Sequence, residues 1–126
     1  MDHTTVQVVE LGGAGDFHTC KIVADRKRII RKVSVVSSVA TSASGASDVS
    51  NYRDFTLYNY TDSEAIATRP TWDGSAADDV AAATEYELVV SEFEVAEDDV
   101  IGLFCDETGT AEDLSAASVT LKIEWI

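Results

Sequence analysis

The feature that most constrains this chain is a strict alternation of apolar and polar residues close to its C-terminal end. The apolar positions are Ala117, Val119, Leu121, Ile123 and Trp125, and the polar positions between them are Ser118, Thr120, Lys122 and Glu124. Successive side chains of a β-strand point to opposite faces of the sheet. The alternation therefore predicts a strand with one face in the core and the other in water, as antiparallel sheets allow.

Comparable patterns predict further strands at Thr4–Leu11, Phe17–Ala24, Ile29–Ala40, Phe55–Tyr60 and Val100–Cys105. The last of these is apolar on both faces, which is typical of a central strand or of a strand covered by a second sheet. In the longest segment, we expect the apolar face to consist of Ile29, Val33, Val35 and Val39.

The alternation changes phase once, between residues 85 and 95. The apolar positions are Tyr86, Leu88 and Val90 before the change, and Phe93 and Val95 after it. A shift of one residue would turn every later side chain to the wrong face. We therefore expect a β-bulge or a bend near Ser91–Glu92.

Residues typical of turns separate these segments. They occur at Gly12–Asp16, Ser42–Asn51, Asp73–Gly74 and Thr108–Thr110, and the single proline, Pro70, is expected in a loop. A short helix is conceivable only at Ser75–Thr84, where Ser75 could cap it. About eight strands with almost no helix predict an all-β fold, a two-sheet antiparallel sandwich of the jelly-roll type. The length fits one domain spanning residues 1–126, with a mobile arm at about residues 1–5.

The charge balance limits the classes of partner. Nine basic residues stand against 23 acidic ones, so the formal net charge is −14. This charge repels phosphates, and we expect no binding to nucleic acid. Membrane association is not expected either, because the apolar runs are far shorter than the ~20 residues that span a bilayer. Asp2, His3 and Glu10 also interrupt the region where a secretory leader would need a basic start and an apolar stretch.

Nothing in the sequence has the pattern of a catalytic or metal centre. The two histidines, His3 and His18, lie near no recognisable nucleophile or cysteine cluster. Carboxylate pairs such as Asp78–Asp79 and Asp98–Asp99 are typical of solvated loops. We expect no enzymatic activity, no cofactor and no metal, although the acidic segment 106–113 leaves a bound cation open.

The two cysteines, Cys20 and Cys105, lie in apolar strand-like runs. A single pair without close spacing is neither a disulfide framework nor a zinc motif. We expect two buried free thiols, because free cysteine packs as a small hydrophobic residue. A bridge stays open if the two strands that carry them lie side by side.

The most unusual local feature is a basic segment, since six of the nine cations lie between Lys21 and Lys32. In a regular strand, Arg26, Arg28 and Lys32 would share one face with Ile30. This face is either a solvated surface whose cations offset nearby acids or a docking surface for an acidic partner.

Aromatic residues gather in one third of the chain, at Tyr52, Phe55, Tyr58, Tyr60 and Trp72. Phe55 is expected to face the core, while Tyr58 and Tyr60 share the opposite face. These rings either pack across strands or, with Trp72, form the platform of a carbohydrate-binding module or adhesin.

Several segments resemble the capsid decoration, or cement, proteins of tailed bacteriophages. They are Thr84–Leu88, Val95–Leu103, Thr108–Thr110, Asp113–Leu114 and Val119–Leu121, with Tyr58–Tyr60 as a further point of similarity. In the family, an Ala-Gly-Asp turn enters a strand that precedes a Thr-Gly loop and an amphipathic last strand. Here Glu97 and Asp98 stand where Ala and Gly are commoner, so this turn is expected to differ.

The resemblance covers about half of the chain and rests on segments that build a fold. It implies a jelly-roll protomer, often a homotrimer, that binds the major capsid protein on the outer surface of the virion. Such a protein stabilises an expanded phage head without catalysis, and the resemblance implies no catalytic residues.

Overall fold

The computed structural model describes residues 4–39, 51–70, 82–88, 90–109 and 113–126. These residues form nine strands and no helix, so none of them belongs to a helix that could cross a membrane. The strands are β1 (Thr4–Leu11), β2 (Phe17–Val23), β3 (Arg28–Ser37), β4 (Tyr52–Asn59), β5 (Glu64–Pro70), β6 (Tyr86–Leu88), β7 (Phe93–Val95), β8 (Val100–Thr108) and β9 (Ser118–Trp125).

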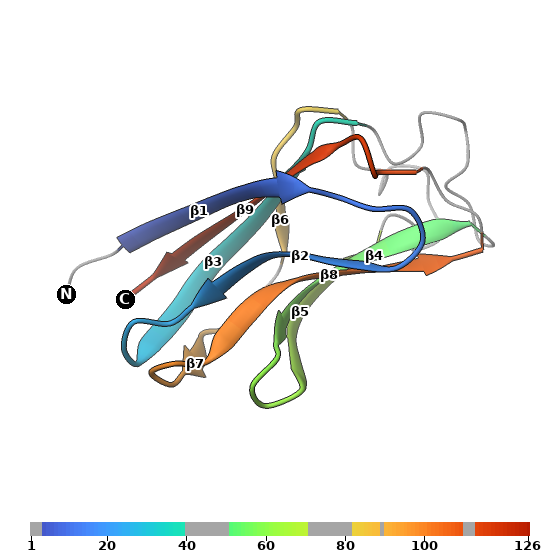
Figure 1. Cartoon of the computed structure of the whole chain (residues 1–126). Helices are drawn as coiled ribbons and strands as arrows, with labels where there is room; N and C mark the ends of the chain where they lie inside the picture. Colours follow the sequence, from blue (N-terminus) through green and yellow to red (C-terminus); the bar gives the residue numbers. More distant parts are fainter. Residues whose placement is uncertain (1–3, 40–50, 71–81, 89, 110–112) are drawn as a thin grey trace.

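The strands form two antiparallel sheets that pack as a sandwich (Figure 1). Sheet A has the order β1-β9-β3-β6, with β7 also paired to β3, and sheet B has the order β2-β8-β4-β5. The pairs are nested along the chain: β1 with β9, β2 with β8, β3 with β6, and β4 with β5. A long antiparallel ribbon wrapped into two sheets in this way is a jelly roll, so the expected fold class is confirmed.

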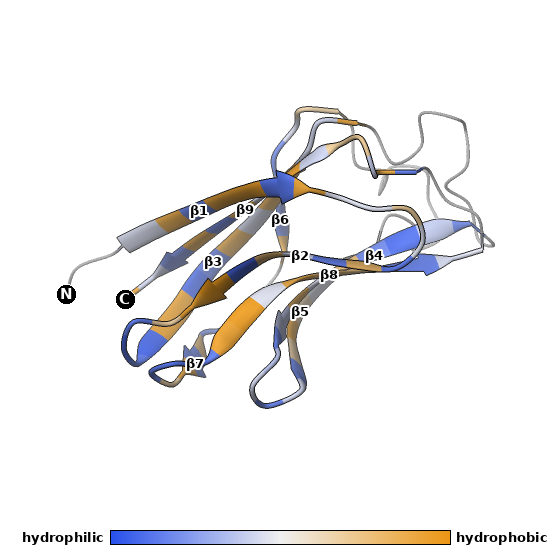
Figure 2. Cartoon of the chain, in the orientation of Figure 1, coloured by the Kyte–Doolittle hydropathy of each residue, from blue (hydrophilic) through white to orange (hydrophobic). Residues whose placement is uncertain are grey.

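The core lies between the two sheets, and hydrophobic and hydrophilic residues alternate along the strands (Figure 2). The fully buried apolar side chains from sheet A include Ile30, Val33, Val35, Val119, Leu121 and Ile123, and those from sheet B include Phe55, Leu57, Ile101, Leu103 and Cys105. Each such side chain contributes about 1.5–3 kcal/mol on removal from water. Strand β8, the segment expected to be covered on both faces, lies centrally in sheet B between β2 and β4.

Thr4 and Thr5, which the expected arm included, belong to β1 and pair with Trp125 and Glu124 of β9. Residues 1–3 lie outside the described residues. So do most of the candidate helix at 75–84, the turn at 73–74, the Asp78–Asp79 pair and the loop 42–50.

The sequence patterns missed β5, and the expectation that Pro70 lies in a loop is wrong. Pro70 ends β5 and stands opposite Asp54 of β4. Proline has no N–H to donate, but β5 is an edge strand, so only one side of it needs hydrogen-bond partners.

Strand β3 contains one additional residue that shifts its alternation. Ile30 lies opposite Trp125 and Lys32 opposite Glu124, so two steps along β3 match one step along β9. The extra residue is Arg31. Because of it, Ile30 rather than Ile29 belongs to the buried core, and the expected apolar face was wrong at that position.

The expected bulge near Ser91–Glu92 is confirmed. Leu88 lies opposite Val33 and Phe93 opposite Ile30, so five steps on one side match three on the other. The two additional residues interrupt the strand, which continues as β7 beside the beginning of β3.

One charged side chain, that of Arg53 in β4, is completely buried within the sandwich. Its Nη1 donates to the carbonyl oxygen of Gly15 at 2.7 Å, and its Nη2 lies 3.4 Å from a carboxylate oxygen of Glu107. Arg53 therefore fastens the β1–β2 loop to the end of β8, and its charge is compensated where it is buried.

In the turn into β8, Asp98 has a backbone conformation that glycine favours, although the residue is not glycine. Asp98 has φ of 70°, the left-handed conformation that glycine adopts without strain. The Asp99 carboxylate accepts hydrogen bonds from the Ala96 N–H at 2.9 Å and from Asn59 Nδ2 at 3.0 Å. Asp98 thus takes a backbone conformation that favours glycine, and Asp99 organises the turn.

We predict that Asp98→Gly stabilises the protein by about 0.5 kcal/mol. Relief of the left-handed conformation exceeds the greater flexibility that glycine gives to the unfolded chain. Denaturant unfolding would measure the change, and Asp98→Ala, which keeps the steric conflict, is the matched control. A glycine variant less stable than the wild type would contradict this account of the turn.

Candidate functional site

The structure divides the basic segment between the core and the surface. Arg26 lies in the turn between β2 and β3 and is exposed, and Lys32 is exposed on the outer face of sheet A opposite Glu124. The Arg28 side chain is only 6% exposed. The expectation that Arg26, Arg28 and Lys32 share one face is therefore wrong, because the additional residue Arg31 reverses the alternation between Arg28 and Lys32.

Arg28 has a structural environment. Its Nε and Nη2 each donate to the Asp25 carboxylate at 2.9 Å, and its guanidinium carbon lies 5.1 Å from the centre of the Trp125 ring. The pairing with Arg28 lowers the pKa of Asp25. Arg28 thus joins the β2–β3 turn to the last strand and is withdrawn from the surface.

Four other cations remain at this end of sheet A: Arg26, Lys27, Arg31 and Lys32, which we call the basic patch. Lys27 Nζ lies 3.5 Å from a carboxylate oxygen of Glu94, and Arg31 Nη2 lies 3.1 Å from one of Glu92. Both acids belong to the segment that includes β7. The patch is thus a group of cations bordered by two carboxylates.

A second candidate surface is the outer face of sheet B, where aromatic side chains from neighbouring strands meet. The His18 ring stacks on Phe104 with centroids 4.6 Å apart, and His18 Nδ1 lies 2.7 Å from the Tyr60 hydroxyl. Tyr58 meets Tyr60 edge to face at 5.0 Å. Tyr58 and Tyr60 are half-buried, whereas Phe55 is fully buried, so the predicted division of these residues between the two faces is confirmed.

Gly102 lets this cluster lie flat on the sheet. A Cβ atom at Gly102 would come within 3.0 Å of the Lys21 side chain and 3.2 Å of the Tyr60 ring. The Lys21 ammonium lies 4.7 Å from the centre of that ring, at the distance of a cation–π contact. We call His18, Lys21, Tyr58, Tyr60 and Phe104 the aromatic cluster; Trp72, also expected in a glycan platform, lies outside the described residues.

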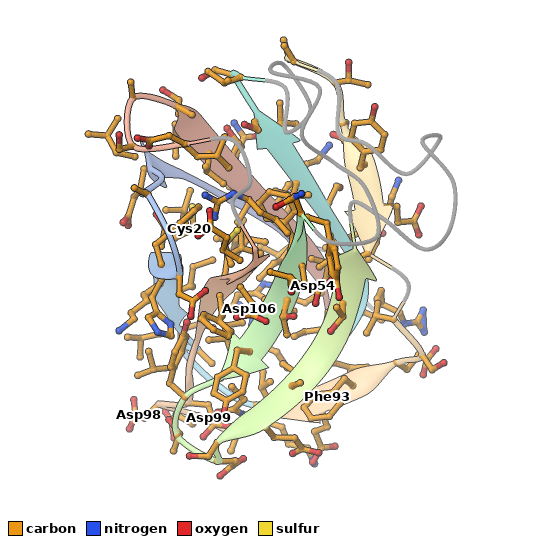
Figure 3. All side chains as sticks on the ribbon, turned by 90° about the vertical axis from the view of Figure 1, so that its right-hand side faces the viewer. Cys20, Asp54, Phe93, Asp98, Asp99 and Asp106 are labelled. Atoms are coloured by element: carbon orange, nitrogen blue, oxygen red, sulfur yellow. The ribbon has the colours of Figure 1, made fainter. Side chains whose placement is uncertain are left out.

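Carboxylates gather on the same face, beyond Phe104. Asp54 and Asp106 lie directly opposite each other on β4 and β8 (Figure 3). Burial and the charge of Asp106 raise the pKa of Asp54. Burial, the charge of Asp16 and a hydrogen bond with it raise the pKa of Asp106. Asp16 in turn accepts a hydrogen bond from the Glu107 N–H at 2.7 Å.

Both cysteines are buried free thiols, as predicted. Burial raises the pKa of Cys20, and it raises the pKa of Cys105 to about 12. Cys20 lies at an irregularity in the pairing of β2 with β8 and its thiol lies 3.3 Å from the Val119 carbonyl oxygen of the other sheet. Both thiols are parts of the packed interior.

Within the described ranges, no pocket is present and no group of three or more histidine, cysteine, aspartate or glutamate side chains could hold a metal ion. Part of the acidic segment 106–113 lies outside those ranges, so a cation there stays an open question. The Asp98–Asp99 pair forms the turn described above, with Asp98 exposed and Asp99 buried.

Sequence reasoning missed His18, Lys21 and Phe104 as members of the aromatic cluster and the meeting of Asp54 with Asp106. The residues come from strands that are far apart in sequence, and only the pairing of β2, β8 and β4 brings them together. The available signal was the two-residue spacing of Phe104 and Asp106, which places them on one face of β8.

We predict that Asp106→Asn stabilises the protein at pH 7 and that the gain disappears toward pH 3. A raised pKa favours the folded state at low pH, and this contribution is lost as the pH rises through the raised value. An amide carries no charge at either pH and can donate to Asp16. Thermal unfolding across this range tests it, with the exposed Glu64→Gln as control; equal gains at both pH values would contradict it.

No protein-family model matches the chain, and no curated protein matches it. Among solved structures, "Structure of infectious bursal disease virus Gx strain" is similar, with a TM-score of 0.36 and 14% identity. The match covers 98% of this chain and 32% of that chain. The present chain therefore spans about one third of the length of that protein.

Proposed function

We propose that this chain is a structural protein that decorates the outer surface of an expanded phage head and binds subunits of the major capsid protein. It acts by surface contact and not as an enzyme, and it assembles as a homotrimer. Many identical copies around a shell allow weak contacts to hold by avidity.

The observation that carries this proposal is the position of the segments that resemble decoration proteins. They form the turn into β8, the end of β8 and the strand β9, within the jelly roll that the resemblance implies. Gly109, at the end of β8, has φ of 69°, so the Thr-Gly segment turns the chain where the resemblance expects a loop. The support thus comes from sequence pattern and backbone conformation at the same positions.

The basic patch is the proposed capsid-docking surface. In a chain with a net charge of −14, its exposed cations Arg26 and Lys32 offer attraction to an acidic surface, which steers association and fixes orientation. The sequence also predicted Arg28 as a docking residue, but its burial against Trp125 excludes it from direct contact with a partner.

Sedimentation with expanded shells that lack decoration tests the proposal. The wild-type chain is expected to co-sediment, and Arg26→Gln with Lys32→Gln is expected to weaken attachment about tenfold and reduce its salt dependence. Gln7→Glu with Ala116→Glu changes the net charge equally at exposed positions outside the patch.

Absence of the wild type from every cognate shell pellet would refute the proposal, and equal binding by the two variants would refute the role of the patch. Light scattering that gives the mass of a monomer would refute the trimer.

The aromatic cluster favours a second candidate function, a carbohydrate-binding sandwich. Sugar rings present apolar faces that stack on aromatic side chains, and Tyr58 and Tyr60 are half-buried on an outward-facing sheet. The exposed Thr68, whose hydroxyl lies 3.0 Å from that of the buried Thr56, could bind a sugar hydroxyl.

Glycan-array binding with the full chain tests this second candidate. If the cluster is a sugar platform, Tyr58→Ala removes a ring from it and is expected to abolish array signals, while Tyr52→Ala, at the far end of β4, leaves them unchanged. An array without any signal, or equal signals for both variants, would exclude carbohydrate binding at this face.

A further inference from the structure

Two carboxylates, those of Glu92 and Glu94, lie beside the basic patch. The interruption between β6 and β7 determines where they lie. The two additional residues between β6 and β7 bring β7 next to the beginning of β3, where Glu94 lies opposite Ile29. From there Glu94 reaches Lys27 at 3.5 Å, and Glu92 reaches Arg31 at 3.1 Å. Two of the four cations of the patch are therefore paired within the chain.

These two ion pairs are open to competition. The side chains of Lys27 and Glu94 are 70% and 60% exposed, and that of Glu92 is 64% exposed. Exposed pairs of this kind contribute little to stability, since water and salt screen them. A carboxylate from outside can replace Glu92 or Glu94 without disturbing the core.

Arg31 leaves part of its hydrogen-bonding capacity unused. Its Nη2 contacts Glu92, but its Nε has no acceptor among the described residues. Guanidinium groups bind carboxylates most strongly through two parallel N–H···O bonds. The Nε is buried, so a carboxylate from outside would reach Arg31 at its terminal nitrogens and compete there with Glu92.

We infer that Glu92 and Glu94 are internal competitors for an acidic segment of a protein partner, and that the partner binds by displacing them from Arg31 and Lys27. The inference rests on the proposed docking role of the basic patch. Charge complementarity selects the occupant: four clustered cations attract a short segment that carries carboxylates, while the net charge of −14 opposes a long polyanion such as nucleic acid. The competition makes attachment weaker and less dependent on salt than four unpaired cations would make it, because an external ion pair forms only as an internal one breaks.

The test uses a short, immobilised polyglutamate peptide as the probe and the intact chain as the ligand. Glu92→Gln with Glu94→Gln is expected to bind about fivefold more tightly than the wild type, because both cations are released. Glu10→Gln with Glu64→Gln makes the same change in net charge at exposed positions outside the patch. The combination Arg31→Gln with Lys32→Gln is expected to weaken binding. Each single variant, Glu92→Gln and Glu94→Gln, is expected to show part of the gain.

Equal affinities of the Glu92/Glu94 and Glu10/Glu64 variants would overturn the inference, as would no binding of any variant or preferential binding of duplex DNA. Parallel sedimentation with undecorated shells separates this result from the proposed function. Tighter polyglutamate binding without attachment to any shell would refute the decoration role while leaving the competition intact. Attachment of the wild type without a gain for the Glu92/Glu94 variant would refute the competition alone.

Discussion

A single additional residue in β3 determines much of the molecule. Arg31 has no partner residue in β9. Ile30 and Lys32, on either side of it, therefore face opposite sides of the sheet, whereas in a regular strand they would face the same side. Ile30 enters the core and Arg28 stacks on Trp125, while Lys32 remains at the surface. The same residue then contacts Glu92. Core packing and surface charge at this end of sheet A thus follow from one local irregularity.

The two outer faces of the sandwich differ in how their charged side chains are paired. On sheet A, cations and carboxylates alternate at close range and compensate one another at the surface. On sheet B, Asp54 and Asp106 face each other, and no ion pair among the described side chains compensates them. Burial and the charge of Asp106 raise the pKa of Asp54, while burial and Asp16 raise the pKa of Asp106. Strands β4 and β8 are distant in sequence, and their pairing in the jelly roll brings their two outward-facing acids together.

The fold class was largely predictable because alternation is a local property. The pattern in β9 predicted which of its residues face the core, the two-sided apolar run of β8 is consistent with its central place in sheet B, and the phase change before β7 predicted the irregularity there. Strand β5 was missed because its sequence, Glu-Ala-Ile-Ala-Thr-Arg-Pro, lacks a regular alternation and ends in proline. It is specified by its pairing with β4 and not by its own residues.

The candidate surfaces were less predictable, because they depend on register. Arg28 and Lys32 have the same parity in sequence, and only the position of Arg31 separates a buried guanidinium from an exposed ammonium. The aromatic cluster likewise depends on the matching of His18 with Phe104 across two strands. Composition showed that cations and aromatic residues are concentrated, whereas pairing decided which of them share a face.

The buried thiols bear on the surroundings in which this fold can persist. With a pKa of about 12, Cys105 carries a reactive thiolate in only about one molecule in 10⁵ at pH 7. Cys20 is enclosed between the two sheets, where its sulfur lies against backbone oxygen atoms. Neither sulfur contributes a cross-link, so the fold requires no oxidant to form and no reductant to remain intact. In this fold the two sulfur atoms therefore serve as packing groups of the interior, and no disulfide bond between the sheets holds the sandwich together.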